Sequence, residues 1–439
     1  MRKITNDIYA VGKTVSFFDK KYPRHTSVKN KRSSNNSDTY ASWGDGNLGP
    51  QNFYKNFVKT DAAVGGLDVL VSAHYGTGFK LHKEIQTEKG IDTIELLVSE
   101  FPDIFDFFDQ TRWQIFMSEI VSDFETFNIC YPEFLLSPDK NKIISVKRHQ
   151  AAHCRLGVPN EKNGLIENVY VNADWENYDE SYTETIRFFN PEVHWEEIKE
   201  FSKRKNIDRF IIPVIAPLTV EKMYPVVKWH SSFRNGWVDV VLSVPEFKKY
   251  MFENQINLKY LVYVADDFFS HKYGQDTWRE FPDEKKEALR VELVTKIDKH
   301  LSGNESSGRS LVSPYFRDRD GKLIKGIEIE AVDDKIKDGN FLPDAASGNS
   351  QILFSMGVDP CLLGAGIPGG KNLSGSGSDK REAYTILCTR MPIRRIRTLE
   401  IFARIRNWNG WPSNLIGKFP NINLTTLDKN PNGQTEIIN

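Results

Sequence analysis

A glycine-rich segment carries the pattern closest to a nucleotide-binding motif. Gly364-Ala-Gly-Ile-Pro-Gly369 matches GxGxxG, in which glycines let the backbone approach a pyrophosphate at a helix N-terminus. A dinucleotide site also needs a buried strand before the glycines and a helix directly after them. Here Asp359-Pro360 precedes the motif and Pro368 interrupts it. We therefore interpret the segment as a flexible loop and predict no bound cofactor.

Two histidines and a cysteine lie close together in the sequence. His149, His153 and Cys154 could bind zinc if a helix placed both imidazoles on one face. The flanking residues are typical of the end of a strand, where a spacing of four does not bring side chains together in this way. We predict structural histidines and no metal site.

Carboxylate pairs could support acid–base chemistry or bind a divalent ion. Such pairs are more often solvated loop charges than proton-sharing dyads. The sequence has no GxxxxGK[ST], HExxH or GxSxG motif. We predict a structural protein and no enzyme, and keep a nucleotide- or metal-dependent enzyme acting on nucleic acid as an alternative. The pairs are Asp266-Asp267, Asp318 with Asp320, and Asp333-Asp334.

A basic helix is predicted between Lys380 and Arg406. One interpretation buries its apolar stripe in the core and leaves the charges solvated. The other has the basic face contact phosphate or an acidic partner surface. The basic residues are Lys380, Arg381, Arg390, Arg394, Arg395, Arg397, Arg404 and Arg406, and the stripe is Ile386, Leu387, Ile393, Ile396, Leu399, Ile401 and Phe402.

The elements that would position these residues are helices and short strands without a regular βαβ alternation, so we predict an α+β fold. One long amphipathic helix is expected from Pro102 to Phe124, because Ile104, Phe108, Phe116, Ile120 and Phe124 are spaced by four or eight. Further helices are predicted at 240–252, 282–300 and 340–356. Strands are predicted at 130–136, 143–148, 165–171, 258–264 and 327–332.

Composition limits the class of protein. The formal net charge of −1 and a pI near 6.8 argue against indiscriminate coating of nucleic acid, which needs many phosphate-neutralising side chains. Four dispersed cysteines favour free thiols in a reducing cytoplasm. No apolar run predicts a signal peptide or a membrane span, so we expect no membrane partner.

The order of several motifs resembles that of portal proteins of tailed bacteriophages. The resemblance covers most of residues 40 to 410, and its most specific part combines a helix end, a proline turn and a glycine loop. The motifs are Trp43-Gly-Asp-Gly-Asn-Leu-Gly-Pro50, Tyr75-Gly-Thr-Gly78, Asp123-Phe-Glu-Thr-Phe-Asn128, Gly236-Trp237, Met356-Gly-Val-Asp-Pro360 and Leu362-Leu-Gly364.

The resemblance implies a ring-forming subunit, usually one of twelve, at one capsid vertex of the virion. Double-stranded DNA would be packaged and ejected through the ring. The implied regions are a flexible N-terminal arm (1–40), the wing (41–235), a stem helix (236–255), the clip (256–338), a second stem helix (339–363), the tunnel loop (364–378), and a wing helix with the C-terminal segment (379–439). Few residues follow Arg406, so a crown would be reduced or absent.

The resemblance also implies where DNA is contacted and which partners bind. The tunnel loop would touch phosphates without reading bases. Partners would be further copies of the chain, terminase, the major capsid protein and a head–tail adaptor, with assembly in the host bacterial cytoplasm. Another capsid or tail-connector component remains an alternative. The DNA-contacting residues would be Lys371, Asn372, Ser374, Ser376 and Lys380.

Overall fold

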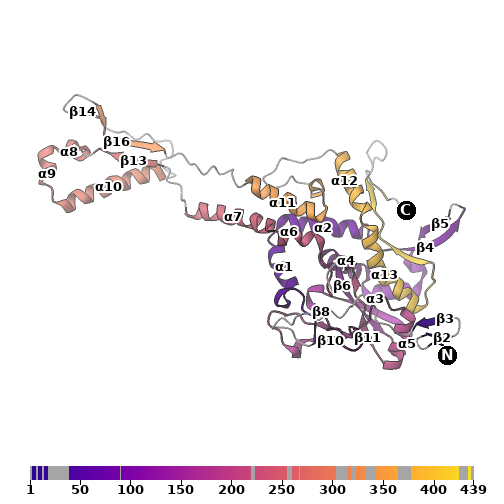
Figure 1. The fold of residues 1–439 in the computed structure, drawn as a ribbon. Helices are drawn as coiled ribbons and strands as arrows, with labels where there is room; N and C mark the ends of the chain where they lie inside the picture. Colours follow the sequence, from indigo (N-terminus) through magenta and orange to yellow (C-terminus); the bar gives the residue numbers. More distant parts are fainter. Residues whose placement is uncertain are drawn as a thin grey trace. The chain divides into compact units, whose positions relative to one another are not determined.

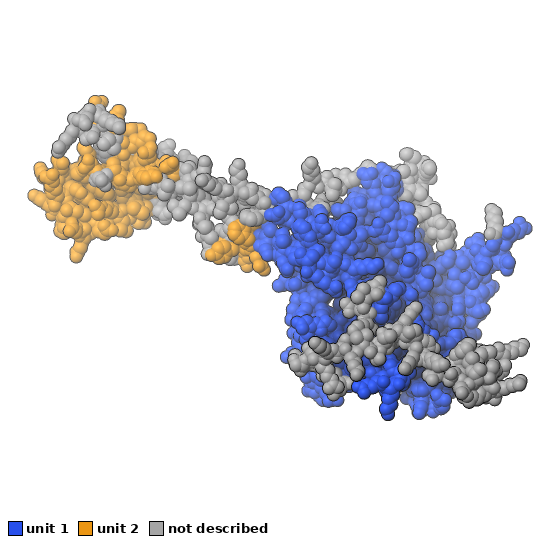
Figure 2. All heavy atoms as spheres, in the orientation of Figure 1, with its two compact units in different colours: residues 1–245, 341–439 blue, residues 246–340 orange. Residues whose placement is uncertain are grey.

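The computed structural model of the chain divides into two compact units (Figure 2). Unit 1 comprises residues 1–245 and 341–439, and unit 2 comprises residues 246–340. We describe each unit by itself. The residues that the structure describes are 2–5, 8–11, 14–17, 39–88, 90–218, 223–254, 260–265, 267–302, 315–317, 323–331, 342–363, 377–424 and 434–436.

Unit 1 combines helices with several sheets, and the predicted α+β class is confirmed (Figure 1). Its helices are α1 Gly49–Phe57, α2 Asp61–Tyr75, α3 Pro102–Thr111, α4 Trp113–Phe127, α5 Trp195–Lys205, α6 Ser231–Arg234, α11 Leu342–Met356, α12 Gly377–Thr389 and α13 Pro392–Asn409. Helix α7, Trp237–Asn254, begins in unit 1 and contains Pro245.

The main sheet of unit 1 has seven strands in the order β12-β6-β11-β10-β9-β8, with β7 also paired to β6. All pairs are antiparallel except β10 with β11. Three of these strands match predicted ones, and the sheet is larger than expected because β8 and β10 to β12 were not predicted. The strands are β6 Ile129–Leu136, β7 Ile143–His149, β8 Cys154–Leu156, β9 Asn168–Val171, β10 Glu184–Phe188, β11 Arg209–Ile211 and β12 Val214–Ile215.

The single long helix predicted from Pro102 to Phe124 is wrong. Arg112 has φ of 50°, in the left-handed region, and separates α3 from α4. The break lets Trp113 enter the core, where its ring stacks on Phe108 at 4.9 Å between centroids. Left-handed backbone is unfavourable for arginine, so no local sequence pattern indicates this break.

Three apolar cores hold unit 1 together. The first packs α3, α4 and the C-terminal half of α13 against the main sheet. The second joins α2, α11, α12 and the start of α7. Their helices approach closely: a Cβ on Gly66 of α2 would lie 2.6 Å from the Met356 sulfur of α11. The third packs β6, β8, β9 and β10 against Tyr224 and its neighbours.

Smaller sheets complete unit 1. A three-stranded sheet has the order β17-β4-β5, which brings the C-terminal region beside residues far earlier in the chain. Three strands within residues 2–17 form an antiparallel meander that we did not predict in the N-terminal arm. The strands are β1 Arg2–Thr5, β2 Ile8–Val11, β3 Thr14–Phe17, β4 Lys80–Thr87, β5 Gly90–Glu95, β17 Leu415–Lys418, β18 Ile422–Leu424 and β19 Gln434–Glu436.

Unit 2 is a small α+β unit with its own apolar cluster, centred on Phe268, Phe269, Ile297 and Ile327. Strand β13 pairs antiparallel with β16, and β14 pairs with β15. Its elements are β13 Tyr260–Val264, α8 Phe268–Tyr273, α9 Gln275–Glu280, α10 Asp283–Ser302, β14 Tyr315–Arg317, β15 Leu323–Lys325 and β16 Ile327–Ala331. In neither unit does any described helix have the length and apolar character needed to cross a membrane.

Candidate functional site

Of the predicted DNA-contacting residues, Lys380 lies in the part of the chain that the structure describes. Lys371, Asn372, Ser374 and Ser376 lie outside the described residues. Lys380 lies in the first turns of α12, where it is exposed to solvent. The structure therefore describes the residues on either side of the predicted loop.

The first end of the predicted loop is fixed on α2 and α11. After α11, the short 3-10 helix Pro360–Leu363 begins with a hydrogen bond from the Cys361 backbone amide to the Asp359 carboxylate, 2.9 Å long. Leu362 and Leu363 pack against the second core. Gly357, with φ of 70°, ends α11, and its carbonyl oxygen accepts a hydrogen bond from Arg390. This contact ties the end of α11 to the end of α12.

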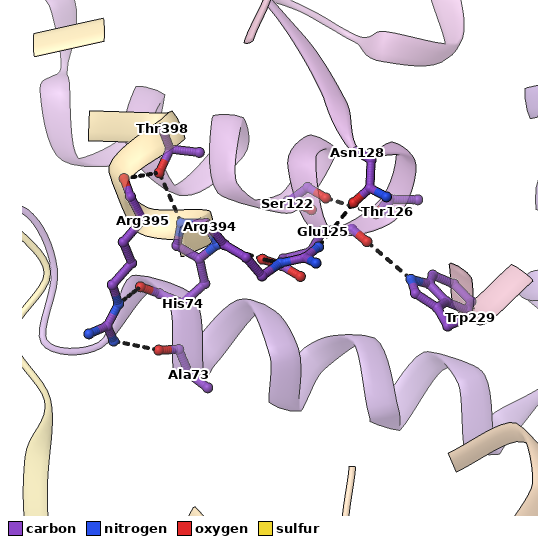
Figure 3. Close-up of polar contacts among 10 residues, drawn as sticks. All are labelled: Ala73, His74, Ser122, Glu125, Thr126, Asn128, Trp229, Arg394, Arg395 and Thr398. Atoms are coloured by element: carbon purple, nitrogen blue, oxygen red, sulfur yellow. Dashed lines mark hydrogen bonds and ion pairs between the residues drawn. The ribbon is translucent and has the colours of Figure 1, made fainter. Parts of the chain in front are cut away.

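A buried polar cluster joins α2, α4 and α13, one helix beyond the second end of the predicted loop (Figure 3). His74 Nδ1 lies 2.5 Å from Glu125 Oε1, and His74 Nε2 lies 2.9 Å from the Thr398 hydroxyl. Arg394 donates from Nε to the same Glu125 oxygen over 2.7 Å, and from Nη2 to Asn128 Oδ1 over 3.2 Å. We call these five residues the helix joint.

Burial and charge set the protonation states within the helix joint. Burial lowers the pKa of His74 below its ordinary value, although the hydrogen bond to Glu125 opposes this. Burial favours the neutral form of Glu125, but the hydrogen bond from His74 and the charge of Arg394 outweigh it and lower the Glu125 pKa. At neutral pH the joint therefore holds a neutral histidine beside an ionised carboxylate and an arginine. Because a carboxylate only accepts, His74 carries its proton on Nδ1.

Neighbouring contacts extend the helix joint. Arg395 donates to the His74 and Ala73 carbonyl oxygens over 2.9 and 2.6 Å, which satisfies the C-terminal end of α2. The Trp229 indole donates to the Glu125 carbonyl oxygen (Figure 3). Glu125 Oε2 is buried and has no hydrogen-bond partner among the described residues.

Hydrogen bonds connect Thr398 to His74 and His74 to Glu125. A nucleophile, a base and an orienting carboxylate are connected in the same way in catalytic triads. The side chains of His74 and Glu125 have no exposed surface, and Thr398 is equally buried. The cavity along α10 and the cavity beside α1 are not lined by these three residues. The arrangement connects three helices through buried side chains.

His149, one of the candidate zinc ligands, lies beside a carboxylate. His149 Nε2 lies 2.8 Å from Glu133, and within the described ranges no group of three or more potential ligands could hold a metal ion.

The predicted basic helix is two helices, since Pro392 begins α13. The interpretation that buries the whole apolar stripe does not hold, because Ile386, Ile393 and Ile396 are 56, 72 and 68% exposed.

Most arginines of α13 are occupied inside the protein. Arg394 and Arg395 bind the helix joint and its neighbours, Arg404 donates to Glu400 and to the Pro191 carbonyl oxygen, and Arg406 donates to the Leu415 carbonyl oxygen. The basic composition therefore serves mainly to fix α13. Sequence spacing could not reveal this, because the acceptors come from distant segments.

A second feature missed by sequence reasoning is a buried cation without a carboxylate. Arg155 has no exposed surface and donates to the side-chain oxygens of Asn47 and Gln51 and to three backbone carbonyl oxygens. Its guanidinium lies over the rings of Trp43 and Trp175, 5.6 and 4.7 Å from their centroids. The Trp43–Pro50 motif thus supplies two acceptors, both on Asn47, and one ring around Arg155.

An aromatic cavity of about 410 Å³ lies between α1 and the segment around His230. Phe53 stacks on the His230 ring at 3.8 Å between centroids. His230 bonds the Thr126 backbone, and its Nε2 atom has no partner among the described residues. Burial lowers the pKa of His230 to about 3, so the ring is neutral at physiological pH.

Comparisons with known proteins identify the fold. No protein-family model matches the sequence, and no curated protein matches it. A chain from the virion of a native gene transfer agent particle is 13% identical, with a TM-score of 0.54 over 87% of this chain and 84% of that chain. A chain from the neck of the native particle, computed with C12 symmetry, is 11% identical, with a TM-score of 0.54 over 88% and 86%.

A third structure, the neck of the empty particle computed with C6 symmetry, gives 13% identity and a TM-score of 0.53 over 88% and 86% of the two chains. The likeness spans nearly the whole of both chains. At this identity it is a likeness of fold. The fold found in the virion and neck of a gene transfer agent particle is therefore the fold of this chain, in agreement with the predicted resemblance to portal proteins.

Proposed function

We propose that this chain is the subunit of a portal ring, which occupies one vertex of a virus-like capsid and forms the channel for double-stranded DNA. The observation that carries the proposal is the agreement between two independent likenesses. The ordered sequence motifs resemble portal proteins, and the fold is shared with a chain of a particle neck computed with C12 symmetry. A closed ring of about twelve copies is the corresponding assembly.

The proposed regions follow the helices and units of the structure. Helices α7 and α11 are the two stem helices, unit 2 is the clip that binds terminase and the head–tail adaptor, and the remainder of unit 1 is the wing facing the major capsid protein. Segment 364–378 is the tunnel loop. Lys371, Asn372, Ser374, Ser376 and Lys380 contact phosphates of the passing DNA, and the helix joint keeps the loop's C-terminal helices in place.

A near-neutral chain suits such a channel. A surface that bound many phosphates would hold DNA tightly, because each neutralised phosphate releases counterions and adds affinity. Sparse positive contacts guide DNA while allowing it to move. The arginines of α13 that are occupied inside unit 1 leave few basic side chains available for DNA along that helix.

The location of the protein in assembled particles tests the proposal. Gold-labelled antibodies against the purified chain should bind disrupted particles at a single site per capsid, where the tail joins. Labelling of every vertex, or of the tail tube alone, would contradict a portal.

A second candidate is another connector component of the neck, which the description of two of the similar structures favours. A connector would lie below the capsid vertex and would remain with the tail when heads and tails are separated. A portal would remain with the head. Fractionation of separated heads and tails distinguishes the two candidates.

A further inference from the structure

One face of α12 and α13 leaves apolar side chains in water. Ile386, Ile393 and Ile396 are 56, 72 and 68% exposed, while Leu387, Ile401 and Phe402 on the same two helices are buried. Burial of an isoleucine side chain stabilises a protein because apolar surface is removed from water, and an exposed isoleucine lacks this contribution. Three exposed isoleucines within eleven residues therefore indicate a surface that is covered by another molecule.

Two arginines flank these isoleucines. Arg397 lies four residues after Ile393 in α13, and Arg390 lies between α12 and α13, three residues before Ile393. Arg390 is exposed and contacts only the Gly357 carbonyl oxygen, and Arg397 has no hydrogen bond or ion pair within the described residues. We call Ile386, Arg390, Ile393, Ile396 and Arg397 the isoleucine face. It is apolar in its centre and positively charged at its edge.

The same chain carries a surface of opposite charge. Along α3 and the short 3-10 helix Val98–Glu100 before it, Leu97 and Phe105 are 68 and 50% exposed. Four exposed carboxylates accompany them, and Asp103 alone has an ion pair within the described residues, 3.5 Å from Lys142. We call this the acidic face; it comprises Leu97, Glu100, Asp103, Phe105, Asp106 and Asp109.

The two faces cannot meet within one copy. The inner sides of α3 and α13 already face each other in the first core, where Phe108 lies 6.2 Å from Phe402 between ring centroids. Phe107 likewise contacts Trp411, which follows α13. The outer sides of both helices are therefore turned toward solvent, and any contact between the two faces needs a second copy.

We propose that the isoleucine face of one copy packs against the acidic face of the next copy. The contact joins two different surfaces, so repetition produces a head-to-tail series that closes as a ring. Self-pairing of the isoleucine face would bring arginines against arginines, and like charges in contact oppose association. An apolar centre with a charged edge is the usual anatomy of a specific interface. The inference rests on the proposed ring and names the surfaces that form it.

A charge exchange tests the pairing. Arg397→Glu alone and Asp106→Arg alone should each raise the protein concentration at which half the chains are in rings by about tenfold, since each places like charges together. The double variant should recover to within about threefold of the unaltered chain. The fraction in rings is measured by mass photometry at constant salt. Two single variants with unaltered assembly, or a double variant worse than either, would overturn the pairing.

Apolar variants test the centre of the interface. Ile393→Asp should abolish rings while the thermal unfolding midpoint of the separate subunit stays unchanged, because the residue is exposed. Ile144→Asp on β7, 45% exposed, is the matched control and should assemble normally. Rings that form equally well with Ile393→Asp would overturn the role of the isoleucine face.

Cross-linking fixes the direction of the contact. The four native cysteines are buried, so introduced cysteines are the accessible thiols among the described residues. With a flexible bis-maleimide, a chain carrying Ile396→Cys and Phe105→Cys should give a ladder of covalent multimers. A mixture of the two single variants should give only covalent dimers, and neither single variant should cross-link with itself.

The cross-linking outcomes separate this inference from the proposed function. Cross-linking of Ile396→Cys with itself would show a twofold contact and overturn the head-to-tail pairing. If the chain carrying both introduced cysteines forms rings that show no cross-link, the proposed interface is wrong and the portal proposal is unaffected. An unaltered chain that stays monomeric under every assembly condition would overturn both.

Discussion

His74 on α2 and Glu125 on α4 share a hydrogen bond of 2.5 Å in a fully buried setting, and Arg394 of α13 binds the same carboxylate oxygen. Three helices from distant parts of the chain thus converge on one carboxylate. A buried charge of this kind destabilises the fold unless its partners stay in place. The position of α13, which follows the predicted tunnel loop, therefore depends on His74 and Arg394.

Removal of His74 should destabilise unit 1 strongly. His74→Ala leaves the Glu125 carboxylate without one of its two partners and removes one of the two acceptors near the Thr398 hydroxyl. We expect a loss of about 3–5 kcal/mol in the free energy of unfolding, measured by urea denaturation. His194→Ala, at an exposed position, is the control and should change it by less than about 0.5 kcal/mol. Equal effects of the two variants would contradict the role of the joint.

Stability should fall as the pH decreases below about 6.5. Burial lowers the pKa of His74, and burial lowers that of His230 to about 3, so both rings stay neutral in the folded chain. In the unfolded chain they bind protons near pH 6.5, so the unfolded state gains protons that the folded state does not. Each histidine then contributes a slope of up to about 1.4 kcal/mol per pH unit.

The variant His230→Phe isolates one of these contributions. Phenylalanine retains the stacking on Phe53 but cannot bind a proton. Unfolding free energies at pH 7.5, 6.5 and 5.5 should show a slope shallower by up to about 1.4 kcal/mol per pH unit below 6.5. An unchanged slope would mean that His230 is protonated in the folded chain.

Arg155 should be indispensable for the fold of the segment that begins at Trp43. Arg155→Ala removes one of the two donors to the Asn47 side-chain oxygen and a donor to several buried carbonyl oxygens, so we expect a loss of more than about 3 kcal/mol in unfolding free energy. Lys147→Ala on the exposed side of β7 serves as control. Trp43 fluorescence should change in the Arg155 variant, since its ring faces the guanidinium. Near-unaltered stability would mean that other donors replace Arg155.

How far the sequence predicts this structure depends on how local each feature is. Strands β6, β7 and β16 and helices α10 and α11 follow from periodicity and turn residues within a few positions. The break at Arg112 does not, because only the tertiary placement of Trp113 favours a left-handed arginine there. The Ile386, Ile393 and Ile396 side chains looked like core residues, since periodicity identifies an apolar side but not what covers it.

The helix joint could not be predicted from the sequence. His74, Glu125 and Thr398 are separated by 51 and by more than 270 positions, and no local pattern relates them. The arginine-rich helix was visible as composition, but the internal acceptors of Arg395 and Arg406 come from other elements. The predicted loop residues Lys371 to Ser376 remain a proposal drawn from resemblance.

Charge reversal in the proposed tunnel loop should affect DNA and not assembly. Lys371→Glu replaces a phosphate-binding group with a repelling one, so particles assembled with this variant should hold less DNA while rings form normally. DNA per particle is measured by quantitative PCR after nuclease treatment. Lys162→Glu, in an exposed loop of unit 1, is the matched control. Equal DNA content in the two variants would remove Lys371 from the DNA-contacting residues.

Cryo-electron microscopy of the purified, unaltered chain tests whether its copies form the proposed portal ring. We expect class averages of a closed ring, about twelve-fold, with an open central channel. A strict monomer under all assembly conditions, or a closed assembly without a channel, would contradict it.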